Sequence, residues 1–157
     1  VVLQTGWRVD DVLSLERSEL ERALRLKRPA LCITEKKTGK RSWKALPREL
    51  LEELHKQCGA RYVFEGRDDI NKHRSRQAVY MDLKRTAKRF GVKINLSPHS
   101  LRKNYAVYIC KKYGFERCKK ELNHENDFVT MLYAFADQMA TKKGKPWRLA
   151  FFLLQSQ

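Results

Sequence analysis

Long apolar runs, closely paired cysteines and a secretory leader pattern are all missing from this sequence of 157 residues. No stretch of roughly eighteen or more apolar residues occurs, so no segment has the length of a membrane-spanning helix. The N-terminus lacks the charged-then-apolar layout of a secretory signal. The cysteines form no C-x-x-C pair, which argues against a zinc ribbon or a thioredoxin-like site. We therefore expect a cytoplasmic protein whose thiols, on Cys32, Cys58, Cys110 and Cys118, are free.

Acidic residues are too few to balance the basic ones. The chain has 34 Lys and Arg against 18 Asp and Glu, which leaves a formal net charge of +16. The basic residues are spread along the chain and are not confined to one tail. Because a broad positive surface attracts polyanions, the composition favours a nucleic acid as the partner. A cationic surface that serves only solubility is the alternative.

Internal repeats and low-complexity segments are also absent, and the length suits one domain with one core. The best candidate linker runs from Lys142 to Pro146, and it precedes a final apolar patch from Trp147 to Leu154. We therefore expect one domain over residues 1–141 and a C-terminal tail over residues 142–157.

Apolar residues recur at the three-and-four spacing of helices over much of the chain. This spacing predicts helices from Arg8 to Leu15, from Pro47 to about Gly59, from Val79 to Gly91, and from Pro98 onward. Leu31 to Glu35 and Trp43 to Leu46 flank a turn that contains Gly39, which predicts a β-hairpin. Val63 and Phe64 are a candidate for one further buried strand. The expected fold class is mainly α with a small antiparallel hairpin (α+β).

The segment Ser97-Pro98-His99-Ser100-Leu101-Arg102 has the features of a phosphate-binding helix start. Serine is a good N-cap, and proline is favoured at the first helical position. His99 and Arg102 are three residues apart and so share one helix face. A phosphate there would meet an imidazole, a guanidinium and the positive end of the helix dipole.

Separate motifs along the chain, in order, resemble the catalytic domain of a tyrosine recombinase of the phage integrase family. They are Thr5-Gly6-Trp7-Arg8 with Asp11, Lys37-Thr38-Gly39-Lys40, His99-x-Leu101-Arg102, Leu122-Asn123-His124 and Thr130-Met131-Leu132-Tyr133. One departure is Asn123, which stands where the family has glycine. The resemblance implies the fold of that catalytic domain. The chain begins almost on its first arginine motif, whereas the family usually places a separate DNA-clamping domain before it, so we expect a piece of a longer protein.

The resemblance also implies catalytic roles. Arg8 and Arg102 would clamp the nonbridging phosphate oxygens, and His124 would hydrogen-bond the phosphate. His99 would be the general base and Lys37 the general acid, with Tyr133 as the nucleophile. The implied product is a covalent 3′-phosphotyrosyl linkage with a free 5′ hydroxyl, formed with no metal, ATP or other cofactor.

The partners that the resemblance implies are double-stranded DNA and further copies of the chain. The expected assembly is a homotetramer on DNA, with a monomer or weak association in its absence. Accessory DNA-bending proteins are further candidates, and the expected location is the nucleoid of a bacterium, with a bacterial or phage gene as the source. Family members often pass a C-terminal element to a neighbouring protomer, so the tail over residues 142–157 is expected to dock either in its own domain or on a neighbour.

Several alternatives remain open at the level of sequence. Lys36 or Lys40 could be the general acid in place of Lys37, and Arg8 could merely pair with Asp10 or Asp11. Tyr133 could be a core residue, since aromatic residues surround it. For the whole chain, the alternatives are a type IB topoisomerase, which uses a similar residue set, and a noncatalytic DNA-binding regulator.

Removal of the tail tests its proposed exchange between protomers. A chain that ends at Thr141 should lose assembly on DNA in sedimentation if the tail links subunits. Assembly on DNA that is unchanged by the truncation would exclude the exchange.

Overall fold

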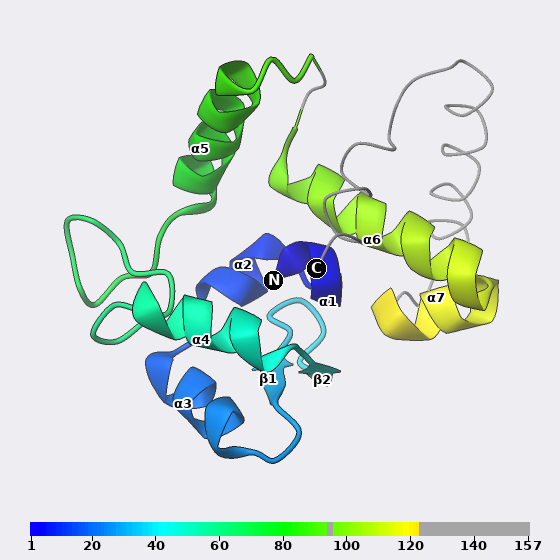
Figure 1. The fold of residues 1–157 in the computed structure, drawn as a ribbon, viewed down its shortest axis with the longest axis horizontal. Coiled ribbons are helices and arrows are strands. Elements are labelled where there is room, and N and C mark those ends of the chain that lie inside the picture. Colours follow the sequence, from blue (N-terminus) through cyan, green and yellow to red (C-terminus); the bar gives the residue numbers. More distant parts are fainter. Residues whose placement is uncertain (94–95, 123–157) are drawn as a thin grey trace. The chain divides into compact units, whose positions relative to one another are not determined.

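The structure, a computed structural model, describes residues 1–93 and 96–122 of the chain. The chain divides into two compact units, Val1–Arg102 and Lys103–Gln157. Figure 1 traces the elements of each unit along the chain. The expected boundary between residues 141 and 142 lies outside the described residues, so it stays a prediction.

Helices supply most of the regular structure in the described part of the chain, as the sequence predicts. The first unit contains α1 (Val2–Thr5), α2 (Val9–Leu13), α3 (Arg17–Arg25), β1 (Ala30–Thr34), β2 (Arg41–Ala45), α4 (Arg48–Lys56), α5 (Arg76–Arg89) and the first residues of α6 (Pro98–Tyr113). The rest of α6 and the helix α7 (Phe115–Leu122) belong to the second unit. The predicted class, mainly α with a small antiparallel hairpin, is confirmed.

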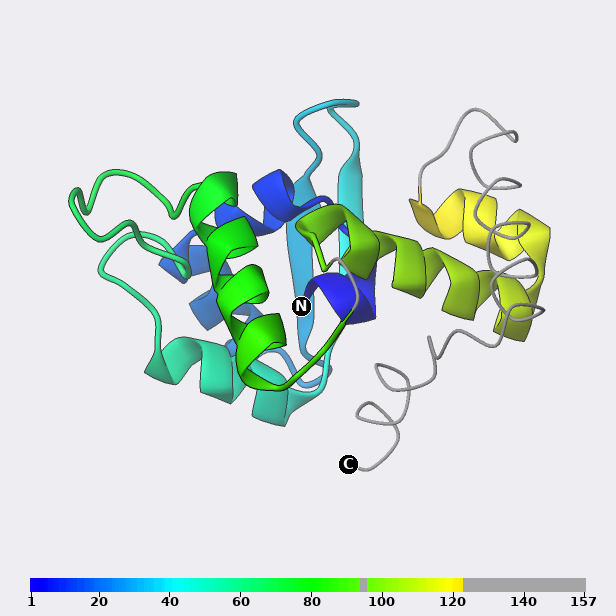
Figure 2. The same cartoon turned by 90° about the horizontal axis from the view of Figure 1, so that it is seen from above.

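Strands β1 and β2 form the predicted hairpin. They pair in antiparallel register from Ala30 opposite Ala45 to Thr34 opposite Arg41. Figure 2 shows the two strands side by side, with the turn that joins them at one end. Leu31 and Ile33, two residues apart on β1, are both buried, which is the period-two burial of a strand with one face on a core.

The core of the first unit lies where the hairpin meets the short helices. Helix α3 packs against α4 and β1, and α2 contacts both β1 and α5. The buried apolar side chains that hold these elements together are Val2, Trp7, Val12, Leu15, Leu20, Ala23, Leu31, Ile33, Leu46, Leu51, Leu54 and Val63. This core fixes the ends of α2 and of the hairpin relative to each other.

A second, smaller core lies in the second unit. Helices α6 and α7 meet across a turn at Gly114, whose φ of 83° lies in the left-handed region that favours glycine. The buried residues there are Tyr105, Ala106, Ile109, Cys118 and Leu122. Cys110 and Cys118 form a disulfide, so the expectation of four free thiols is wrong for this pair. The turn brings their Cα atoms to 5.0 Å, within the usual range for a bridge.

Some local elements differ from those that the sequence pattern predicts. The pattern does not predict α3, whose N-cap is Glu16 in a capping box with Glu19, in place of the more common serine, threonine, asparagine or aspartate. The expected strand at Val63 and Phe64 is absent from the described structure: the two residues form a turn, although Val63 is buried. Burial of one apolar residue in a turn produces the same short pattern as a strand.

None of the helices in the described part of the chain has the length and apolar character that crossing a membrane requires.

The core of the first unit should depend strongly on Leu51, which is fully buried. Truncation of this side chain leaves a cavity, so Leu51→Ala should lower the free energy of unfolding by about 2–5 kcal/mol. Urea unfolding followed by tryptophan fluorescence measures the change. The matched control is Leu26→Ala, because Leu26 is 40% exposed, and it should alter the free energy of unfolding by less than about 0.5 kcal/mol. Equal effects of the two substitutions would contradict the assignment of the core.

Candidate active site

The backbone that leads into Arg8 is fixed by Gly6 and Trp7. Gly6 ends α1 in the left-handed conformation, with φ 70° and ψ 6°. Trp7 is 1% exposed, and its indole Nε1 donates a hydrogen bond of 2.9 Å to Oγ of Ser42 on β2. Arg8 then adopts an extended conformation as the N-cap of α2. The position of Arg8 is therefore set by the core on one side and by a helix start on the other.

The side chain of Arg8 pairs with Glu35, the residue that follows β1. Its Nη1 donates to Glu35 Oε2 at 2.7 Å, and the two side chains are 28% and 3% exposed. The alternative that Arg8 merely pairs with Asp10 or Asp11 is wrong. Asp10 contacts Arg76 instead, at 3.3 Å, and Asp11 accepts a hydrogen bond from the hairpin turn. The carboxylate partner of Arg8 thus lies 27 residues away in the sequence.

The turn that carries Lys37 is held by backbone and side-chain bonds. Gly39 N–H donates to Glu35 O at 2.8 Å, and Glu35 N–H donates to Lys40 O at 2.9 Å. Gly39 has a φ of 67°, which a residue with a Cβ adopts only with strain. Lys36 N–H donates to Asp11 Oδ1 at 3.0 Å, which attaches the turn to α2. Lys37 is exposed at this turn.

Arg102 reaches the same region from the start of α6. Ser97 caps this helix as predicted, because its Oγ accepts a hydrogen bond from Ser100 N–H at 3.2 Å. Arg102 is only 5% exposed, and its Nη1 donates to Gly6 O at 2.6 Å. A contact across 96 residues therefore brings the second arginine motif to the backbone that precedes Arg8.

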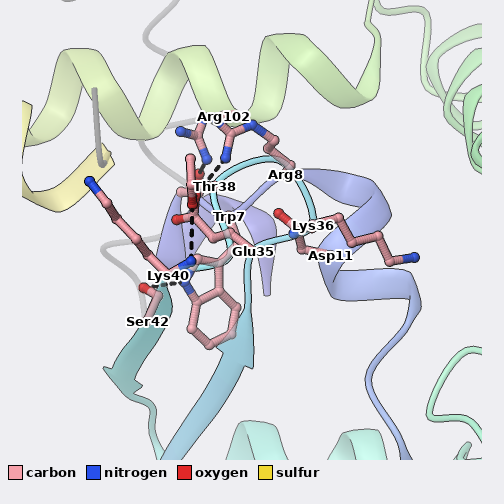
Figure 3. Close-up of polar contacts among 10 residues, drawn as sticks. Trp7, Arg8, Asp11, Glu35, Lys36, Thr38, Lys40, Ser42 and Arg102 are labelled. Atoms are coloured by element: carbon pink, nitrogen blue, oxygen red, sulfur yellow. Dashed lines mark hydrogen bonds and ion pairs between the residues drawn. The ribbon is translucent and has the colours of Figure 1, made fainter. Parts of the chain in front are cut away.

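Figure 3 shows how these groups lie relative to one another. The guanidinium groups of Arg8 and Arg102 point to the same region, beside the turn that carries Thr38. The side chain of Lys36 points away from both of them. Guanidinium groups stay charged and present planar forks of donors that match phosphate oxygens. The pair with Glu35 engages one of the five N–H donors that a guanidinium carries. The arrangement therefore suits an oxyanion.

The remaining predicted site residues are less fully placed. His99 is exposed in the first turn of α6, three residues before Arg102. His124 and Tyr133 lie outside the described residues, so their approach to the arginines stays a prediction.

Glu35 and Thr38 also belong to this site, although the sequence pattern does not predict them as site residues. Thr38 Oγ1 donates to Glu35 Oε2 at 3.1 Å, so one carboxylate oxygen accepts hydrogen bonds from both Thr38 and Arg8. The one available signal was an acidic residue at the start of an otherwise basic turn. Its pairing with Arg8 depends on tertiary contacts that no local pattern encodes.

Comparisons with known proteins find similarity in sequence to one family and in fold to several solved structures. The model of the phage integrase family matches residues 1–139 of the chain. Among solved structures, XerA recombinase is 18% identical with a TM-score of 0.67, over 91% of this chain and 54% of that one. XerH site-specific recombinase, bound to a palindromic difH substrate, is 17% identical with a TM-score of 0.64, over 93% and 43% of the two chains. A lambda integrase tetramer bound to a Holliday junction is 17% identical with a TM-score of 0.63, over 84% and 39%.

These likenesses confirm the expected catalytic-domain fold. The chain spans only about half, or less, of the length of these three solved proteins. A search of curated proteins finds no match.

The attachment of the turn to α2 can be tested by amide hydrogen exchange at Lys36. Asp11→Ala removes the acceptor of the Lys36 N–H, and loss of such a bond should speed its exchange by about tenfold or more. Exchange is a better measure here than the free energy of unfolding. Asp11 Oδ2 is buried with no hydrogen-bond partner in the described structure, so its removal stabilises the fold and opposes the loss of the bond to Lys36. The control is Asp10→Ala, which removes a surface carboxylate from the same helix and should leave Lys36 unchanged. Unchanged exchange in Asp11→Ala would show that the carboxylate does not hold the turn.

Proposed function

Since this chain belongs to the phage integrase family, we propose that it is the catalytic domain of a site-specific tyrosine recombinase, which cuts and rejoins DNA strands. The observation that carries the proposal is the meeting of three distant segments in the first unit. Arg102 bonds to the backbone before Arg8, and Arg8 bonds through Glu35 to the turn that holds Lys37. Two guanidinium groups and a lysine-bearing turn at one place would supply the cationic part of a phosphoryl-transfer site.

The two arginines would bind the scissile phosphate. Attack on a phosphodiester builds negative charge on the nonbridging oxygens, and donors already fixed in place stabilise that charge without reorganisation. Arg102 is held by Gly6 and Arg8 by Glu35, so both groups are oriented before DNA arrives. His124 would add a further hydrogen bond to the phosphate.

The bond exchange itself would use a phenol, a base and an acid. The Tyr133 oxygen attacks phosphorus and its proton passes to His99, while the bond from phosphorus to the 5′ oxygen breaks. Lys37 gives a proton to that departing oxygen and leaves a 5′ hydroxyl. The 3′-phosphotyrosyl bond keeps the energy of the original ester, so the reverse reaction can rejoin strands with neither metal nor ATP.

The proposed partner is double-stranded DNA, bound by further copies of the chain. The charge of +16 supports a polyanionic partner. Solved relatives in fold include XerH bound to its difH substrate and a lambda integrase tetramer on a Holliday junction. By analogy, we propose a homotetramer on DNA, with accessory bending proteins as further candidates and a nucleoid-associated, cytoplasmic location. Within this assembly, residues 1–141 would form the catalytic domain and residues 142–157 a tail that docks in the same protomer or in its neighbour.

Covalent trapping of DNA tests the proposal. We would incubate the protein with a pool of nicked suicide duplexes whose sequence is randomised around the cleavage position, and isolate adducts that survive SDS. Wild type should yield a covalent adduct with one preferred sequence, and Tyr133→Phe should abolish the adduct because it removes the attacking oxygen. Tyr113→Phe is the control: this tyrosine is 55% exposed at the end of α6, and loss of its hydroxyl should leave the yield unchanged.

The other outcomes distinguish the competing functions. Adducts without sequence preference would indicate relaxation of the topoisomerase type. A folded, DNA-bound wild type that forms no adduct would contradict catalysis and leave a DNA-binding regulator.

A further inference from the structure

Glu35 is a buried carboxylate at the centre of the candidate site, and none of the proposed catalytic steps uses it directly. Its side chain is 3% exposed, which is costly for a charged group unless donors surround it. The Oε2 atom accepts from Arg8 Nη1 at 2.7 Å and from Thr38 Oγ1 at 3.1 Å. One oxygen therefore joins the arginine that would bind phosphate to the turn that would supply the general acid.

The hydrogen bonds of the turn show how Glu35 affects the position of Lys37. Lys37 lies between Lys36, whose N–H is held by Asp11, and Thr38, whose hydroxyl is held by Glu35. Both neighbours of Lys37 are thus held by carboxylates, Lys36 by Asp11 on α2 and Thr38 by Glu35 at the start of the same turn, while Lys37 itself is exposed. Since a lysine side chain is long and flexible, the place from which it starts decides where its ammonium group can act.

We propose that Glu35 is a positioning residue for DNA cleavage, which acts through Thr38 to set the distance between Lys37 and the phosphate on Arg8. This inference rests on the proposed recombinase function and deepens it. Proton donation to the leaving 5′ oxygen requires hydrogen-bond reach, and a displacement of about 1 Å in such a site can cost on the order of a hundredfold in rate. The bond from Thr38 to Glu35 ties the general acid to the anion-binding arginine, so the two move as one group.

Thr38 offers a way to cut this link without undoing the turn. The backbone bonds from Gly39 to Glu35 and between Glu35 and Lys40 do not involve the Thr38 hydroxyl. Thr38→Val keeps the shape of the side chain and removes only the hydroxyl, which donates to Glu35 and accepts from Lys40 N–H at 3.3 Å.

The test compares two leaving groups. The preferred duplex from the trapping experiment would be made with the normal 5′ oxygen, or with sulfur in its place at the cleaved bond. A thiolate leaves without protonation, so a defect in delivery of the proton disappears on the sulfur duplex. Lys37→Ala serves as the reference for complete loss of the general acid.

Thr38→Val should slow single-turnover adduct formation by about 10- to 100-fold on the oxygen duplex and by less than about threefold on the sulfur duplex. The matched control is Thr34→Val, which makes the same change at an exposed position on β1 and should slow neither reaction. Urea unfolding of each variant checks that the fold is intact.

Each other outcome overturns the inference in a recognisable way. Equal slowing on both duplexes would mean that the hydroxyl affects phosphate binding or the fold, and no slowing would mean that it has no role. A wild type that cleaves neither duplex would contradict the proposed function itself, whereas an active wild type with an unaffected Thr38→Val would contradict only the inference.

Discussion

The pair between Arg8 and Glu35 is the interaction on which the rest of the site depends. A carboxylate that is 3% exposed must be compensated by hydrogen bonds, and Glu35 receives them from Arg8 and Thr38. The same hydrogen bonds that compensate the charge of Glu35 also hold Arg8 and the hairpin turn in place. Electrostatic compensation of one buried charge therefore fixes the relative positions of two elements that are far apart in the sequence.

A second constraint brings Arg102, at the start of α6, close to Arg8. Gly6 adopts a left-handed conformation at the end of α1, and its carbonyl oxygen accepts a hydrogen bond from the guanidinium of Arg102. Arg102 is nearly buried, so this bond replaces part of the hydration that the side chain loses. The two arginines are thus positioned by different means, one by an ion pair and the other by a backbone carbonyl. Both act within the first unit, on segments from the two ends of its chain.

Strong local signals in the sequence matched the structure well. Ser97 and Pro98 correctly marked the start of α6, and the basic segment with Gly39 correctly marked the hairpin turn, because capping and turn geometry depend on neighbouring residues. Weak or unusual signals failed. Helix α3 begins at a glutamate in place of a common cap residue. Val63 is buried although it lies in a turn, so its burial does not indicate a strand. The bridge between Cys110 and Cys118 was also missed, because it depends on the turn at Gly114 between two helices.

The sequence by itself determined the helical class, the hairpin and the cationic character, and its motifs predict which residues would carry out phosphoryl transfer. Those properties follow from composition, from spacing and from motifs that the family shares. Only the tertiary structure decided that Arg8 pairs with Glu35 and not with its neighbours Asp10 and Asp11, and that Arg102 binds the carbonyl of Gly6. The physical reason is that the partner of a buried charge is chosen by which donors and acceptors the packed core brings within about 3 Å. The spacing of residues along the chain therefore does not predict which partner a buried charge has.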